Sequence, residues 1–173
     1  MQTALRAGLR VVFFLTGTVF DLQEAVSINK AVEDPRRRTL IFAHIDLIQG
    51  IGRDPAGMRV LAKQVGVDGI LTTRSNLIRA AKDEGLYTIQ RLFILDSESL
   101  KTAVQILNAS KPDAVELLPA LVLPNIQRRL PVDTLPPIIA GGLVETQAEL
   151  QTVLRTPAKA VSTSAQTLWF AAT

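Results

Sequence analysis

Seven short apolar runs alternate along this chain with amphipathic segments, and this alternation constrains the fold more than any other feature. The runs predict strands at 11–17, 40–48, 69–74, 87–95, 114–120, 137–142 and 160–164. Helical patterns lie between them, near 21–33, 55–65, 75–84, 97–109, 120–130 and 145–154, with a last helix near 165–171. Strands joined by crossover helices must pair in parallel. The sequence therefore predicts an α/β protein with a parallel sheet.

Polar residues at the ends of the predicted strands distinguish between two architectures. A dinucleotide-binding open sheet would carry G-x-G-x-x-G after its first strand, and "LTGTVFD" at 15–21 does not contain that motif. A (β/α) barrel instead gathers polar groups near the carboxyl ends of its strands, and each predicted strand here contributes a polar residue or a glycine toward that rim. We therefore expect a TIM-like (β/α) barrel of seven strand–helix units, an incomplete or irregular form of the eight-fold barrel. It would form a single domain over residues 1–173.

Composition excludes several classes of function. The chain of 173 residues contains no cysteine, which rules out disulfides, thiolate catalysis and cysteine-based zinc sites. Its N-terminal apolar run is only "VVFFL" at 11–15, and no run approaches the roughly 18 residues that span a bilayer. We expect a cytoplasmic protein with no membrane partner.

The segment "LIFAHIDLI" places the single histidine, His44, and Asp46 inside an apolar run. Alternation along a strand would put both side chains on one face, together with Phe42. Three interpretations stay open: a buried pair that satisfies itself, a ligand anchor whose histidine is tuned by the carboxylate, or part of a metal site with Glu116. The metal site has the least support, because the spacing is not diagnostic.

The last two predicted strands end in "IIAGGL" and "VSTSA", a pattern that favours phosphate binding. Backbone N–H groups can approach an anion closely at Gly141 and Gly142. Ser162, Thr163 and Ser164 add hydroxyl groups at the expected start of a helix, where the helix dipole favours negative charge. The alternative is that the glycines only form a tight turn and the hydroxyls only cap a helix.

Evidence for catalysis is weak. All six lysines fall in predicted helices or loops, so Schiff-base chemistry has no strand lysine to use, and no G-x-S-x-G elbow is present. An acid–base enzyme that uses Glu116 with His44 remains an alternative. We predict no catalytic residue, no metal and no cofactor.

Arginine supplies 13 of the 19 basic residues in a chain of net charge +3. Its planar guanidinium pairs with phosphate through two hydrogen bonds, so a polyanionic partner is one interpretation and a solvated surface is the other. The clusters are Arg36, Arg37 and Arg38, and Arg128 and Arg129.

The order of these motifs resembles the glycerol-3-phosphate-responsive antiterminator family of bacteria. The similar segments are "FFLTG", "FAHIDLIQGIGRD", "DGILTTRSNLIRAAKDEGLYTIQRLFILDSESL", "KPDAVELLPA", "IIAGGL" and "AVSTS", and they extend over residues 12 to 169. The resemblance implies a (β/α) barrel that binds glycerol-3-phosphate. It also implies that the liganded protein acts on the leader mRNA of glycerol-utilisation operons, so that transcription passes a terminator.

The resemblance also implies roles for individual residues. Gly141, Gly142, Ser162, Thr163 and Ser164 fit the phosphate end of the ligand. Thr16, His44, Asp46, Gln90 and Glu116 fit a polar pocket for the glycerol hydroxyls. The five clustered arginines are the candidate RNA surface, and a homo-oligomer could close an incomplete barrel.

The chain departs from the family pattern at two positions. Arg74 stands in "TRSN" where the family suggests Thr-Lys-Pro-Asn, and Ala120 stands where glycine is expected after "LLP". Arg74 keeps the positive charge but changes its shape, and it is counted among the ligand-binding residues.

Overall fold

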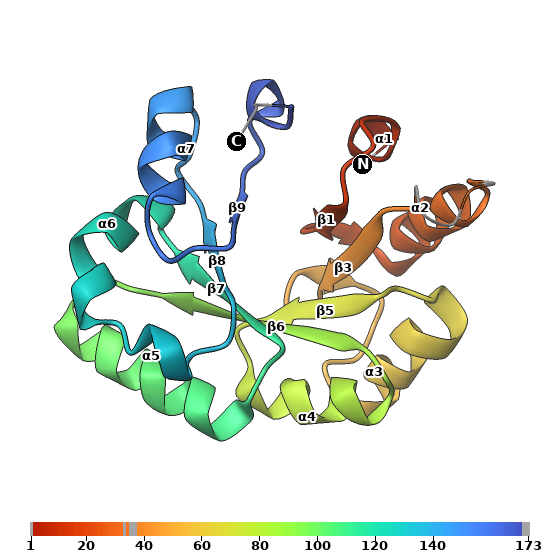
Figure 1. Cartoon of the computed structure of the whole chain (residues 1–173). Coiled ribbons are helices and arrows are strands. Elements are labelled where there is room, and N and C mark those ends of the chain that lie inside the picture. Colours follow the sequence, from red (N-terminus) through yellow and green to blue (C-terminus); the bar gives the residue numbers. More distant parts are fainter. Residues whose placement is uncertain (1, 33, 35–37, 171–173) are drawn as a thin grey trace. The chain divides into compact units, whose positions relative to one another are not determined.

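A computed structural model of the chain describes residues 2–32, 34 and 38–170. The chain divides into two compact units, residues 1–89 and residues 90–173, which Figure 1 colours from red to yellow-green and from green to blue. Each unit has its own hydrophobic core and its own set of parallel strands.

The first unit is built on parallel strands with helices between them. Strand β3 (Leu40–His44) pairs with both β1 (Val11–Phe14) and β5 (Gly69–Thr72). The short strands β2 (Gly17–Thr18) and β4 (Ile48–Gln49) form a separate parallel pair. The helices are α1 (Gln2–Arg6), α2 (Val19–Lys30), α3 (Pro55–Val60), the π-helical turn η2 (Leu61–Val65) and α4 (Ser75–Asp83).

Alternation along β3 separates the core of the first unit from its polar residues. Ile41 and Ala43 belong to the core that α2, α3, η2 and α4 cover, whereas Phe42 and His44 project from the opposite face. The ring of Phe42 lies where a side chain on Gly69 of β5 would have to go. Gly69 is therefore required by the close approach of an aromatic ring.

The second unit repeats the pattern with the end of β6 (Tyr87–Phe93), followed by β7 (Ala114–Leu118), β8 (Ile138–Gly141) and β9 (Ala160–Ser162), in that spatial order. Its longer helices are α5 (Ser97–Ser110) and α7 (Gln147–Leu154). Between β7 and β8 the chain forms η3 (Ala120–Val122), α6 (Leu123–Ile126), η4 (Gln127–Arg129) and η5 (Val132–Thr134), and η6 (Gln166–Leu168) follows β9.

The seven predicted strands are all present in the described part of the chain, but several end earlier than expected. The predicted strand 40–48 ends at His44, and a turn over 45–47 follows. The predicted helix near 120–130 is broken into short helical turns, and the last predicted helix is a single 3₁₀ turn. Ala120 does not have a positive φ, so the helical turn that begins there does not need the glycine of the family pattern.

Among the described residues, no helix is long and apolar enough to cross a membrane. That a single domain extends over residues 1–173 stays a prediction.

Three helices begin with reciprocal capping boxes in the described residues, and each box contains a carboxylate. Asp21 pairs with Thr18 at α2, Asp96 with Ser99 at α5, and Glu149 with Thr146 at α7. Hydrogen bonds lower the pKa of each carboxyl from its usual value, 3.8 for the aspartates and 4.5 for Glu149. The donors are Thr18 for Asp21, Ser99 for Asp96, and the backbone N–H groups of Glu145 and then Thr146 for Glu149. Folding therefore favours the ionised form of all three.

Because the folded-state pKa values lie below the unfolded ones, this stabilisation is fully present above the usual values and is lost as the pH falls through the folded ones. We expect the free energy of unfolding to decrease once the pH drops below about 4.5. Glu149→Gln should flatten part of this acid dependence in urea titrations across pH 3 to 7. A Glu149→Gln curve parallel to that of the wild type would contradict the assignment.

Candidate functional site

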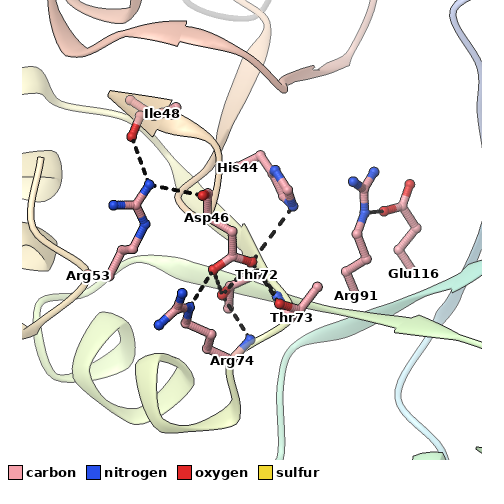
Figure 2. Close-up of polar contacts among 9 residues, drawn as sticks. All are labelled: His44, Asp46, Ile48, Arg53, Thr72, Thr73, Arg74, Arg91 and Glu116. Atoms are coloured by element: carbon pink, nitrogen blue, oxygen red, sulfur yellow. Dashed lines mark hydrogen bonds and ion pairs between the residues drawn. The ribbon is translucent and has the colours of Figure 1, made fainter. Parts of the chain in front are cut away.

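Asp46 is the centre of a polar cluster in the first unit (Figure 2). It lies in the turn after β3, and its carboxylate accepts hydrogen bonds from the loop that follows β5. Thr72 Oγ1 donates to both carboxylate oxygens at 3.1 Å, and the backbone N and Oγ1 of Thr73 donate to Oδ2 at 2.7 and 3.0 Å. The carboxylate thus joins the end of β3 to the start of α4.

Two arginines contact Asp46, one at its carboxylate and one at its backbone. Arg74 Nε lies 3.2 Å from Oδ1 of Asp46, and its side chain is 54% exposed against 11% for the aspartate. Arg53 donates from Nη2 to the Asp46 backbone oxygen at 3.0 Å. A half-exposed arginine can exchange a protein carboxylate for an anionic ligand, so this cluster is suited to binding negative charge.

His44 faces Asp46 but is not its main partner. Its Nε2 atom lies 3.8 Å from Oδ2, too far for a hydrogen bond, and the side chain is 4% exposed. The strand prediction correctly placed His44 on the face away from the helices. β3 ends at His44, so Asp46 lies in the turn that follows and not in the strand. Its carboxylate still lies on the same side as His44, as alternation predicted.

Removal of the Asp46 carboxylate should destabilise the first unit. Asp46→Ala is expected to lower the free energy of unfolding by about 2 kcal/mol, because the donors of Thr72 and Thr73 lose a charged acceptor. Arg74→Ala is the matched control and should cost less than about 1 kcal/mol, since it removes a largely exposed ion pair. Urea denaturation of both variants checks this, and equal losses would show that the arginine pair carries the stability.

Glu116 is the centre of a second polar cluster, in the second unit. Along β7, Val115 and Leu117 belong to the core that the helices cover, so Glu116 projects from the other face. Arg91 Nε on β6 donates to Oε2 (Figure 2), and Ser162 Oγ on β9 donates to Oε1 at 2.6 Å. The Glu116 side chain is 1% exposed and that of Arg91 is 12% exposed. A carboxylate buried this deeply requires such partners.

Gly141 explains how Ser162 reaches Glu116 across an intervening strand. β8 lies between β7 and β9, and Gly141 is paired in register with Ser162. A Cβ atom at Gly141 would collide with Oε1 of Glu116 and would lie 2.7 Å from Oγ of Ser162. The missing side chain is therefore what allows this hydrogen bond.

The other residues predicted to bind phosphate are neighbours of Gly141 and Ser162 in the sequence. Gly142 has a φ of +79°, which favours glycine. Thr163 Oγ1 donates to the backbone oxygen of Val144 at 2.6 Å, while Ser164 is exposed. The segment after them begins η6, whose three residues form too short a helix for the expected dipole contribution.

A methyl group at Gly141 should break the link between β9 and β7. We expect Gly141→Ala to lower the free energy of unfolding by about 1–3 kcal/mol, as overpacking usually does. Ser162→Ala removes one of the two groups that would collide with the new methyl group. It should therefore lower the free energy of unfolding less in the Gly141→Ala variant than in the wild-type protein. Urea denaturation of the single and double variants measures this coupling, and strictly additive losses would contradict the proposed collision.

The structure brings together some predicted residues and adds others. His44, Asp46 and Arg74 meet in the first unit, and Glu116, Gly141 and Ser162 meet in the second. Prediction missed Arg53, Thr72 and Thr73 as partners of Asp46, and Arg91 as the partner of Glu116. A buried glutamate implies a nearby cation, but nothing local in the sequence indicates that this cation is Arg91.

The remaining predicted residues differ in their exposure to solvent. Gln90 is fully buried on β6, and Thr16 is exposed after β1. Arg38, Arg128 and Arg129 are exposed, whereas Arg36 and Arg37 lie outside the described residues. Over the described part of the chain there is no group of three or more His, Asp or Glu side chains that could hold a metal ion.

Parallel strands with helices between them, and polar groups after the strands, define the class of protein. An aldolase is similar in fold, with a TM-score of 0.69 at 12% identity over 95% of this chain and 81% of its own. At that identity the likeness concerns the fold alone. It confirms the predicted TIM-like (β/α)-barrel class.

The particular family is given by closer similarities. Residues 1–169 match the family model described as glycerol-3-phosphate responsive antiterminator, and the chain belongs to this family. The glycerol uptake operon antiterminator regulatory protein of Listeria monocytogenes is 32% identical, with a TM-score of 0.85 over 98% of this chain and 88% of its own. The protein YgcP of Escherichia coli strain K12, which is uncharacterized, is 31% identical over 98% of this chain and 85% of its own length.

Proposed function

We propose that this protein is a transcription antiterminator that binds glycerol-3-phosphate and acts on the leader mRNA of glycerol-utilisation operons. The observation that carries the proposal is the family match over residues 1–169. Arg91, Glu116 and Ser162 support it, because they place charged and polar groups on strands of the unit that also contains the Gly141–Gly142 corner. A protein that acts on nascent bacterial mRNA would be located in the cytoplasm.

For the phosphate end, we assign the Gly141–Gly142 corner and residues 162–164, with Arg91 as the neighbouring positive charge. Thr163 already donates its hydroxyl proton to Val144, so backbone N–H groups and the exposed hydroxyl of Ser164 are the better donors in this segment. Glycine at 142 lets an anion approach the backbone without a side chain in the way.

For the hydroxyl end of the ligand, we propose Gln90 and Glu116, which belong to the same unit as the Gly141–Gly142 corner. Thr16, His44, Asp46 and Arg74 belong to the first unit and stay predictions from the sequence. Asp46 would act by positioning Thr73 and Arg74, since its carboxylate accepts from both residues. Arg74 is the better candidate for direct contact, because it is the more exposed partner.

A role as an acid–base enzyme has less support than a regulatory role. Glu116 is 1% exposed and already accepts hydrogen bonds from Arg91 and Ser162, whereas a general base must lie within hydrogen-bond reach of the proton that it removes from its substrate. No lysine lies on a strand in the described residues. Turnover of a phosphorylated ligand with His44 and Glu116 is therefore an outcome to be tested and is not our proposal.

For the RNA surface, we propose the exposed arginines Arg128 and Arg129 of the second unit. A role for Arg36, Arg37 and Arg38 stays a prediction from the sequence. Arg129 donates to Ser97 Oγ at 3.4 Å, a long hydrogen bond to an exposed partner, so the guanidinium can turn to a phosphate at little cost. Contacts of this kind add affinity without reading base sequence.

Calorimetry and a binding assay test the two halves of the proposal. We expect glycerol-3-phosphate to bind without being consumed, and Gly142→Asp to abolish binding, because a carboxylate in the corner repels phosphate. The leader RNA of a glycerol-utilisation operon should bind more tightly when glycerol-3-phosphate is present. Consumption of the ligand, or RNA affinity that is the same with and without it, would contradict the proposal.

The salt dependence of RNA binding tests the arginine surface separately. Arg128→Ala with Arg129→Ala should weaken RNA binding and reduce the slope of log affinity against log salt by about 2. Arg155→Ala, a change of another exposed arginine of the second unit, is the matched control and should leave the slope unchanged. Equal effects of the two changes would place the RNA surface elsewhere.

A further inference from the structure

We infer that Ser162 is a specificity-determining residue whose oxygen accepts a hydrogen bond from a ligand hydroxyl, and that the site thereby prefers an alcohol next to the phosphate-bearing carbon over the corresponding ketone. This inference rests on the proposed function and changes one of its assignments. Ser162 was predicted to donate to phosphate. The hydrogen bond that it makes in the structure assigns it to the opposite role.

The argument begins with the single proton of the Ser162 hydroxyl. A serine hydroxyl carries one hydrogen and two lone pairs. Ser162 Oγ donates that hydrogen to Oε1 of Glu116 at 2.6 Å, a short distance that is typical of a hydroxyl bound to a carboxylate. With its proton committed, Ser162 can offer only lone pairs to a ligand. Phosphate oxygens are acceptors, so they are not its partners.

The direction of this hydrogen bond is set by the surroundings of Glu116. Arg91 donates to the other carboxylate oxygen, and arginine stays protonated. An ionised carboxylate beside a guanidinium can only accept, and the Glu116 side chain is 1% exposed. If the Ser162 hydroxyl rotated away, Oε1 of Glu116 would lose its donor while it stays buried. This costs free energy, so the Ser162 proton stays on the carboxylate side.

Gly141 leaves the space in which the Ser162 hydroxyl meets the carboxylate. Oγ of Ser162 lies 2.7 Å from the position that a Cβ atom of Gly141 would occupy, and Oε1 of Glu116 lies beside the same position. The serine oxygen therefore lies over the glycine with its proton directed at the carboxylate. Its lone pairs point elsewhere, and the residue is only half-buried, so a ligand can reach it.

The consequence is a choice between two oxidation states of the same carbon. A secondary hydroxyl can donate to Ser162, and the chain from ligand hydroxyl to serine to carboxylate then has every donor matched to an acceptor. A ketone offers only an acceptor, which would face the serine lone pairs. Glycerol-3-phosphate and dihydroxyacetone phosphate differ in this one group, so the site should distinguish them although both carry the same phosphate.

The test measures three affinities on the full-length protein: glycerol-3-phosphate, dihydroxyacetone phosphate and inorganic phosphate. The chain has one tryptophan, Trp169, whose Nε1 donates to the backbone oxygen of Thr163 at 3.1 Å. Its fluorescence should report binding at this segment, with calorimetry as the independent measurement. We expect the wild-type protein to prefer the alcohol over the ketone by about tenfold or more, the equivalent of one hydrogen bond to a buried acceptor.

Three variants separate this role from phosphate binding. Ser162→Ala should reduce the alcohol-to-ketone ratio toward one while inorganic phosphate binds as in the wild type. Ser162→Thr keeps the hydroxyl and should restore the ratio, which shows that the effect is not a loss of folding. Ser164→Ala is the matched control: it should weaken all three ligands alike and keep the ratio.

The outcomes distinguish failure of this inference from failure of the proposed function. If the wild-type protein binds both organic ligands equally, or if Ser162→Ala weakens all three ligands by the same factor, the serine is not the selector and the inference is overturned while ligand binding stands. If the wild-type protein binds none of the three, the inference and the proposed ligand are both overturned.

Discussion

A buried carboxylate needs donors on every side, and the second unit is arranged around this requirement at Glu116. Because the side chain is almost fully buried on β7, its charge is matched by Arg91 on β6 and its other oxygen by Ser162 on β9. The serine reaches it only because Gly141 on the strand between them has no side chain. One charged residue thus decides the residue type at three other positions.

The same requirement operates in the first unit with a different result. Asp46 is nearly as enclosed, but its donors come from the consecutive residues Thr72, Thr73 and Arg74 of a single loop. It therefore fixes the path of the chain into α4. Glu116 instead joins three strands, which makes its neighbours parts of a rigid sheet. A rigid sheet is the better place for groups that must distinguish similar ligands.

Much of the strand framework and part of the site could be predicted from the chain. Alternation of Ile41, Ala43 and His44 along one strand correctly separates the core face from the polar face. The strand ends at His44, four residues earlier than predicted, but the turn still brings Asp46 to the same side as His44. Prediction could not identify Arg91 as the partner of Glu116, since the two residues are 25 positions apart and only the placement of β6 beside β7 brings them together.

By itself, the sequence determined the order of strands and helices, the family, and which residues carry charge near strand ends, because these depend on local periodicity and on motifs in one chain segment. Only the tertiary structure decided what those residues do. The hydroxyls of Ser162 and Thr163 look equivalent in "VSTSA", yet one donates to a buried carboxylate and the other to a backbone oxygen. A hydroxyl has one proton, and which acceptor lies within reach is set by the strand packed beside it.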